Sequence, residues 1–181
     1  MRFPVPFKDD FTAAQRRFAE SIASGPRGEL RGPFLALIHS PELDERVQKL
    51  GEYLRFETKF PASLTEMGVL LVARKYKSAN VWHSHRALAL KAGLDPKIVA
   101  AIAARRRPAR MPDEAGRVYD FCTDLMRRGD VSDEHFDKVV AVWGQGGAAD
   151  LIALVGYYIM LSQVYNVSHF ALPEGGVPFQ P

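Results

Sequence analysis

Apolar side chains recur every three or four positions along most of the chain, and alternating, strand-like stretches are short or absent. This spacing places the apolar residues of a segment on one face of an α-helix, where they can pack against neighbouring helices. The pattern therefore predicts an all-α fold of about six to eight helices. The predicted helices cover residues 10–23, 40–57, 63–76, 79–93, 95–104, 113–128, 132–143 and 148–167.

Two of these segments form the expected centre of the fold, a helical hairpin over about residues 63–92. Ser63 and Glu66 have the S-x-x-E spacing of a capping box, in which the serine and the glutamate satisfy free backbone N–H groups at a helix start. Gly93 follows the second helix, where a glycine commonly ends a helix. The capping box gives Glu66 a structural role that needs no chemistry.

Length and composition indicate one folded domain over residues 1–181, with residues 1–30 as an N-terminal helix and arm. Hydrophobic residues make up 47% of the chain and charged residues 25%, as in ordinary folded proteins. The formal net charge of +3 is too small and too spread out to indicate nucleic-acid binding. With one cysteine, Cys122, no disulfide forms within the chain, and a reducing compartment is expected.

Segments that would direct the chain to a membrane are not evident in the sequence. The N-terminus has no uninterrupted apolar stretch, and no segment reaches the roughly 18 apolar residues needed to span a bilayer. We therefore expect a cytoplasmic protein with no membrane partner.

His83 and His85 are the first candidates for chemistry, because they lie beside Trp82 at the start of a predicted helix. Two residues apart on a helix, they point in directions about 200° apart and cannot chelate one ion. No other Cys, His or Asp cluster at ligand spacing supports them, so we expect no metal site. Trp82 and His85 share a largely apolar helix face, where His85 is either a buried, hydrogen-bonded residue or a titrating group in a pocket.

Three further motifs have structural explanations. The "GQGG" at 144–147 lacks the spacing of a phosphate-binding loop and is expected to be a turn between helices. The basic loop at 105–110 could bind an acidic partner, although a solvated loop explains it as well. Cys122 lies among apolar residues at helical spacing, which indicates a core position.

The predicted hairpin resembles the carboxymuconolactone decarboxylase family, which belongs to the alkylhydroperoxidase D-like group. In that family a glutamate on the first helix is followed by a C-x-x-C pair in the peroxidase branch and then by a histidine before the helix end. Glu66 matches the glutamate, Ser78 and Val81 occupy the cysteine positions, and His85 matches the histidine. The "KAGL" at 91–94 matches the helix end, and stretches at 31–43, 119–126 and 154–167 extend the resemblance.

The resemblance implies the decarboxylase-like branch of the family, because both cysteines of the peroxidase branch are absent. Without the thiol pair, peroxide reduction by a thiolate and its resolving partner is not expected. The decarboxylase-like subgroup often has "EW-x-x-H" where this chain has "VWHSH", so Val81 replaces a carboxylate that could act with the histidine. The reaction can therefore differ from that of the family example.

By this resemblance we expect a lyase or isomerase without a cofactor, acting on a small carboxylate-bearing lactone or related ring. Histidine suits proton transfer because its ordinary pKa, about 6.5, is close to working pH. His85 is then the acid or base, and Glu66 orients it or raises its basicity. The residues expected to contact substrate are Trp82, Tyr157, His39, His83 and Arg31.

Two other hypotheses remain open from the sequence. A binding or scaffold protein on the same fold is favoured by Val81, and a metal-dependent enzyme would use His83 and His85. The expected partner is a small-molecule carboxylate, and the resemblance also implies a homo-oligomer, either a trimer or a hexamer.

Overall fold

The computed structural model describes residues 2–25, 28–173 and 175–181, and in this part of the chain all regular structure is helical. The elements are a short 3-10 helix, η1 (Lys8–Asp10), and the helices α1 (Ala13–Ser24), α2 (Phe34–Leu37), α3 (Pro41–Phe56), α4 (Ala62–Lys75), α5 (Ala79–Lys91), α6 (Pro96–Ala103), α7 (Asp113–Arg128) and α8 (Asp133–Ser168). The all-α prediction is confirmed. The sequence pattern missed η1 and α2 because neither is long enough to show a helical period.

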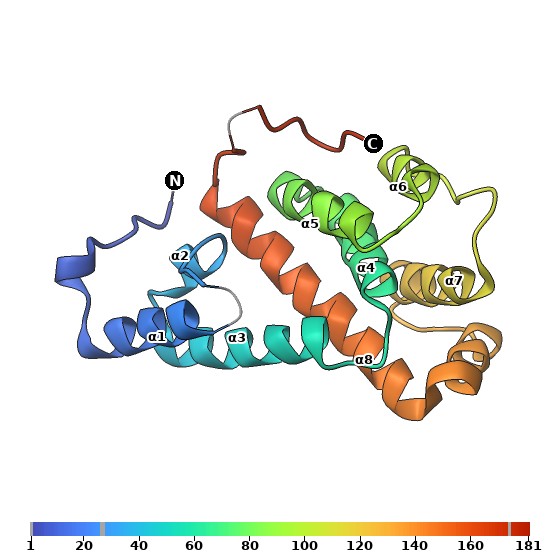
Figure 1. Ribbon diagram of the computed structural model, residues 1–181, viewed down its shortest axis with the longest axis horizontal. Coiled ribbons are helices and arrows are strands. Elements are labelled where there is room, and N and C mark those ends of the chain that lie inside the picture. Colours follow the sequence, from blue (N-terminus) through green and yellow to red (C-terminus); the bar gives the residue numbers. More distant parts are fainter. Residues whose placement is uncertain (1, 26–27, 174) are drawn as a thin grey trace.

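Helix α4 forms the centre of the molecule, and the hairpin that it makes with α5 is confirmed (Figure 1). It packs against α5, α6, α7 and α8, and every residue from Leu64 to Ala73 is buried. At Gly68 the approach to α8 is so close that an added Cβ would lie 3.0 Å from a Leu154 methyl carbon. A helix enclosed on all sides needs mostly apolar residues around its circumference, and between Leu64 and Ala73 only Thr65 and Glu66 are polar.

Helix α8 runs diagonally across the molecule, with the α4–α5 hairpin and α7 on one side and α1–α3 on the other (Figure 1). The predicted segments 132–143 and 148–167 are two parts of this helix, which kinks at Gly144. Gly144 has φ 71°, a left-handed conformation that favours glycine. The expected turn at 144–147 is therefore this one residue, since helical structure resumes after it.

Helix α8 is the candidate membrane span among the described residues. By length and composition alone α8 could cross a membrane, although the sequence pattern had indicated no such segment. Its contacts are those of a core helix, because it packs against α4 and α7 and buries residues along its length. The length and composition of α8 are therefore only weak evidence that it spans a membrane.

The junction of α7 and α8 depends on Asp124. Its carboxylate accepts hydrogen bonds from His135 Nδ1 at 2.8 Å and Ser132 Oγ at 3.1 Å, and it pairs with Arg127 at 3.1 Å. The bond from His135 is the largest reason why the pKa of Asp124 falls to about 2. Asp124 therefore joins the end of α7 to the first turn of α8.

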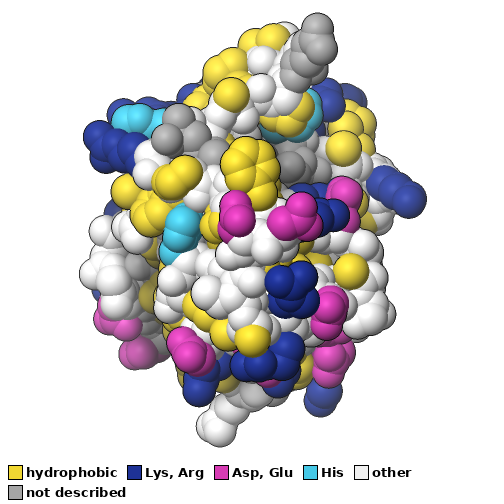
Figure 2. Space-filling model, turned by 90° about the vertical axis from the view of Figure 1, so that its left-hand side faces the viewer, with side chains coloured by type: hydrophobic (Ala, Val, Ile, Leu, Met, Phe, Trp, Pro, Cys, Tyr) yellow, Lys and Arg dark blue, Asp and Glu magenta, His cyan; other side chains and the backbone are white. Residues whose placement is uncertain are grey.

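Helix α3 lies at the surface and buries only some of its apolar residues. Its buried residues include Val47 and Leu54, whereas Leu43 and Leu50 are exposed. The face of the molecule over α1 and α3 carries acidic and basic side chains next to one another (Figure 2). The end of α3 nevertheless reaches the buried Glu66 of α4, through Arg55.

Candidate active site

Glu66 and His85 face each other across the α4–α5 hairpin. His85 Nδ1 and Glu66 Oε2 are 2.6 Å apart, and the two side chains are only 12% and 9% exposed. A hydrogen bond to an ionised carboxylate in such surroundings is short and strong. The pair that the sequence spacing indicated is therefore brought together.

The capping box predicted for Ser63 and Glu66 is wrong. Helix α4 begins at Ala62 after Pro61, and no side chain caps it. Ser63 thus lies inside the first turn, and the Glu66 carboxylate extends to α5 rather than to the backbone. Proline at the N-cap fixes the entry of the chain without any side-chain bond.

Arg55, near the end of α3, also reaches Glu66. Its guanidinium nitrogen lies 3.8 Å from Glu66 Oε1, and its side chain is 17% exposed. The two oxygens of one carboxylate thus face an arginine and a histidine, which come from different helices. The contact of Arg55 with Glu66 could not be predicted from the sequence, because an arginine in the last turn of a helix is commonly explained by the helix dipole.

Two tyrosines of α8 complete the surroundings of the imidazole. The Tyr158 ring meets His85 edge to face at 5.0 Å between centroids, and Tyr157 meets Tyr158 in the same way at 5.2 Å. Edge-to-face contacts restrict ring rotation. Together with the bond at Nδ1, they fix the orientation of His85.

His85 lines a cavity of about 840 Å³ between the loop before α2, the end of α3, helices α5 and α8, and the chain around residues 170–173. Of the side chains expected from the sequence to contact substrate, Arg31, His83 and Tyr157 line it, and Arg55 does so as well. Apolar wall residues include Val81, Leu88, Leu161 and Phe170. A mostly apolar cavity with a few converging polar groups is the usual form of a small-molecule site.

Two expected substrate contacts lie elsewhere. Trp82 is buried, and its Nε1 donates to the backbone oxygen of Gln180 at 3.0 Å, so it holds the C-terminal segment against α5. His39 is exposed, and its Nε2 lies 2.9 Å from the backbone oxygen of Pro4. Neither lines the cavity of His85, because each faces a terminal segment of the chain.

The positions that match the two family cysteines are buried. Ser78 is the residue before α5, and Val81 lines the cavity of His85. The single thiol, Cys122, is on α7, and burial raises its pKa to about 12. Within the described ranges, no three His, Cys, Asp or Glu side chains are grouped so as to hold a metal ion.

The geometry gives His85 two distinct nitrogens. With Glu66 ionised, Nδ1 carries the proton that Glu66 accepts, which fixes the tautomer. In the part of the chain that the structure describes, nothing bonds to Nε2. Nε2 is therefore available to exchange a proton with a molecule in the cavity.

Comparison with known proteins identifies the class of fold. No family model and no curated protein matches the sequence. Among solved structures, the chain is similar to an alkylhydroperoxidase AhpD core, an uncharacterized peroxidase-related protein from Ralstonia eutropha JMP134. The TM-score is 0.77 at 17% identity, over 98% of this chain and 97% of that chain. The all-α alkylhydroperoxidase D-like fold is thus confirmed.

Proposed function

We propose that this protein is a lyase or isomerase without a cofactor, resembling carboxymuconolactone decarboxylase and acting on a small carboxylate-bearing lactone or related ring. The observation that carries the proposal is the 2.6 Å bond between Glu66 and His85, with His85 on the wall of a cavity that Arg31 and Arg55 also line. Acid, base and anion-binding groups are thus available in one place.

The proposed chemistry requires only binding and proton transfer. In a decarboxylation, the bond between the ring and its carboxylate carbon breaks and CO₂ leaves. The electron pair passes into the unsaturated lactone as an extended enolate, so the substrate itself accepts the electrons. His85, protonated at Nε2, then donates a proton to the ring carbon, and Glu66 stabilises the imidazolium that serves as donor.

The arginines explain why the substrate should be an anion. Arg55 is largely buried and shares the Glu66 carboxylate with His85, while Arg31 lies at the exposed edge beside Glu29, 3.2 Å away. Guanidinium groups bind carboxylates through paired hydrogen bonds. A substrate carboxylate held at Arg31 would place the reacting ring among the apolar lining residues, which include Val81 and Leu161.

Thiol peroxidase activity does not fit this chain, although the similar solved structure is described as peroxidase-related. Ser78 and Val81 occupy the places of the two family cysteines, and Cys122 is fully buried with a raised pKa. Peroxide reduction by a thiol needs an accessible thiolate. We infer that the chain carries the fold without that chemistry.

A second candidate is a binding protein without catalysis, and Val81 is the observation that favours it. Val81 lines the cavity at the position where the decarboxylase-like subgroup often has a carboxylate. If that carboxylate is needed for turnover, the cavity would bind a carboxylate ligand and release it unchanged. Binding without turnover separates this candidate from the lyase.

The test is a panel of γ-carboxymuconolactone and related lactone acids, with loss of the conjugated chromophore as the measurement. We expect His85→Asn to abolish turnover while leaving ligand binding largely intact. Glu66→Gln should lower kcat about 5- to 30-fold, because a neutral hydrogen bond replaces a charge-assisted one. The matched control is His169→Asn, at an exposed residue with φ 55°, a conformation that asparagine tolerates.

Turnover by His85→Asn at the unaltered rate would refute the assignment of His85. Turnover by no panel member, with saturable binding of the lactone acids, would favour the binding protein. The proposed trimer or hexamer is tested separately by light scattering on the purified protein, and a monomer would refute it.

A further inference from the structure

A second cavity, separate from that of His85, lies among the ends of α4 and α6 and one face of α7. It has a volume of about 480 Å³ and shares no lining residue with the first. Among the described residues, its lining contains six basic ones and no acidic one: Arg74, Lys75, Lys77, Arg105, Arg106 and Arg127. The chain as a whole has 24 basic and 21 acidic residues, so this cavity concentrates a charge that is nearly balanced elsewhere.

Five of the six basic residues come from two helix ends that meet, and the sixth, Arg127, is on α7. Arg74 and Lys75 form the last turn of α4, and Lys77 follows it, while Arg105 and Arg106 follow α6. Arg74 is half-buried, and its Nε donates to the backbone oxygen of Ala103 at 2.7 Å, which connects the two ends. Burial, reinforced by the charge of Arg105, lowers the pKa of Arg74.

Known partners do not neutralise this charge. Arg127 pairs with Asp124, but in the described ranges the other five basic side chains form no ion pair with a carboxylate. The carbonyl ends of α4 and α6 contribute about half a negative charge each, which leaves about four positive charges without compensation. Repulsion among them favours an anion in the cavity.

The remaining lining residues indicate what a ligand would carry besides an anionic group. Leu71, Ile102 and Met126 form an apolar surface, and Tyr119 and Thr123 bring hydroxyl groups from α7. Burial is the main reason why the pKa of Tyr119 is raised, so its hydroxyl stays neutral and can donate a hydrogen bond. An ion alone would leave the apolar surface uncovered.

We propose that this cavity binds a small organic phosphate, with the phosphoryl group among Arg74, Arg105 and Arg106 and an apolar body against Leu71 and Ile102. A doubly charged phosphoryl group matches several guanidinium groups better than a single carboxylate does. The site is independent of the proposed lyase activity, because neither its residues nor its test involves His85.

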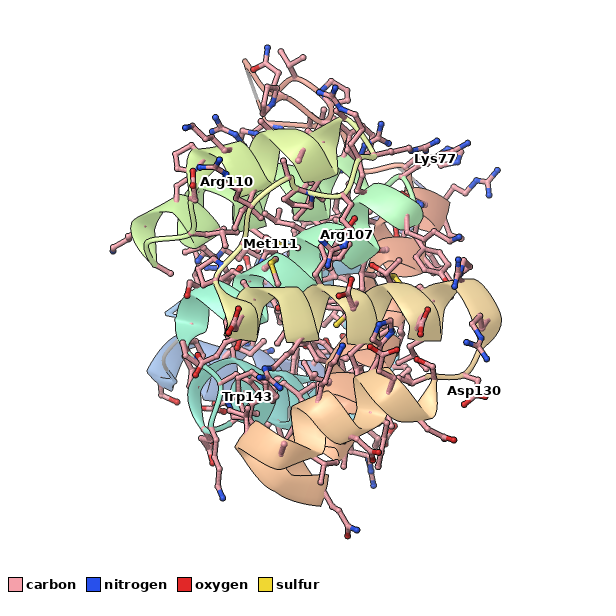
Figure 3. The ribbon with its side chains drawn as sticks, turned by 90° about the vertical axis from the view of Figure 1, so that its right-hand side faces the viewer. Lys77, Arg107, Arg110, Met111, Asp130 and Trp143 are labelled. Atoms are coloured by element: carbon pink, nitrogen blue, oxygen red, sulfur yellow. The ribbon has the colours of Figure 1, made fainter. Side chains whose placement is uncertain are left out.

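The basic loop at 105–110 provides a matched control within itself. Arg105 and Arg106 line the cavity, whereas Arg107 pairs with Asp120 at 2.8 Å and Arg110 is exposed; neither of these lines it. Figure 3 faces this side of the molecule and shows Lys77 and Arg110 well apart, with Arg107 between them. Two double variants therefore remove the same charge from the same loop, one inside the cavity and one outside it.

The experiment is calorimetric titration of the full chain with phenyl phosphate, inorganic phosphate and benzoate at low salt. We expect one phenyl phosphate per chain, bound more tightly than either of the other probes. Arg105→Gln with Arg106→Gln should weaken it by about tenfold or more, and Arg107→Gln with Arg110→Gln by about twofold at most. Equal weakening by both pairs would show general charge attraction and overturn the proposal. Benzoate binding as tightly as phenyl phosphate, or no saturable binding of phenyl phosphate, would overturn it as well.

Discussion

Cys122 offers the sharpest test of the argument against peroxidase chemistry. The thiol is fully buried on α7, where its sulfur would lie 3.8 Å from a Cβ added at Gly68 of α4, and burial raises its pKa from 9.0 to about 12. Three pKa units reduce the fraction of thiolate at neutral pH by about a thousandfold. Replacement by alanine should leave any activity unchanged and cost about 1 kcal/mol of stability through the lost packing.

The raised pKa also predicts how stability changes with pH. In the unfolded chain the thiol loses its proton from about pH 9, whereas in the folded protein it keeps the proton until about pH 12. Stability from this group is therefore complete below pH 9 and falls by about 1.4 kcal/mol per pH unit above it. Cys122→Ala removes that contribution, so the stability difference between the two proteins should shrink and then reverse as pH rises.

The assays are reaction with a thiol reagent, peroxide consumption with added reductant, and urea unfolding from pH 7 to pH 10.5. We expect the native thiol to react at least about a thousandfold more slowly than the same thiol in urea. A native thiol that reacts as fast as an unfolded one would refute the assignment of a buried, protonated group. Peroxide consumption that disappears in Cys122→Ala would refute the argument against peroxidase chemistry.

Three further variants test the local structure by urea unfolding. Asp124→Asn should lower the free energy of unfolding by about 2 kcal/mol at pH 7, because the native pKa of Asp124 is about 2 against an ordinary 3.8. This loss of stability should fade as the pH drops from 4 toward 2. A loss that persists at pH 2 would contradict the origin in the lowered pKa. Gly32→Ala should lower the free energy of unfolding by about 1–3 kcal/mol more than Gly28→Ala does. Both glycines have positive φ, but only at Gly32 would a Cβ lie 2.5 Å from the Tyr165 hydroxyl. Equal losses of stability in the two variants would contradict that clash. Ser63→Ala should change stability by less than about 0.5 kcal/mol, whereas loss of a capping box would cost about 1 kcal/mol.

The parts of the fold that could be predicted from sequence are those with a local physical signal. Long helices can be predicted from the periodicity of their apolar residues. Asp95 before Pro96 indicates the start of α6, and in the structure its carboxylate accepts a hydrogen bond from the backbone N–H of Lys97 at 2.8 Å. The kink at Gly144 follows from a glycine-rich interruption between two apolar segments. Such signals depend on neighbours within a few residues.

The candidate site could be predicted only in part, because its remaining members depend on contacts between distant helices. Trp82 and His85 are three residues apart, yet one bonds the C-terminal segment and the other lines the cavity, since α5 is covered on more than one side. Arg55 reaches Glu66 only because α3 ends beside α4. Nothing in the sequence around either residue encodes that meeting.

The net charge of Arg55, Glu66 and His85 depends on whether His85 carries a second proton. When His85 is neutral, the arginine and the glutamate balance each other; when His85 is protonated, the three carry one positive charge between them. In the proposed reaction, the protonated histidine is the form that would donate a proton from Nε2 to an anionic substrate. In that proposed reaction, transfer of the proton to the developing carbanion would return the three residues to neutrality, while Glu66 stays bonded to Nδ1. The proposed cycle would use one carboxylate with two partners, and this agrees with a Glu66 that is buried at the centre of the hairpin and does not cap α4.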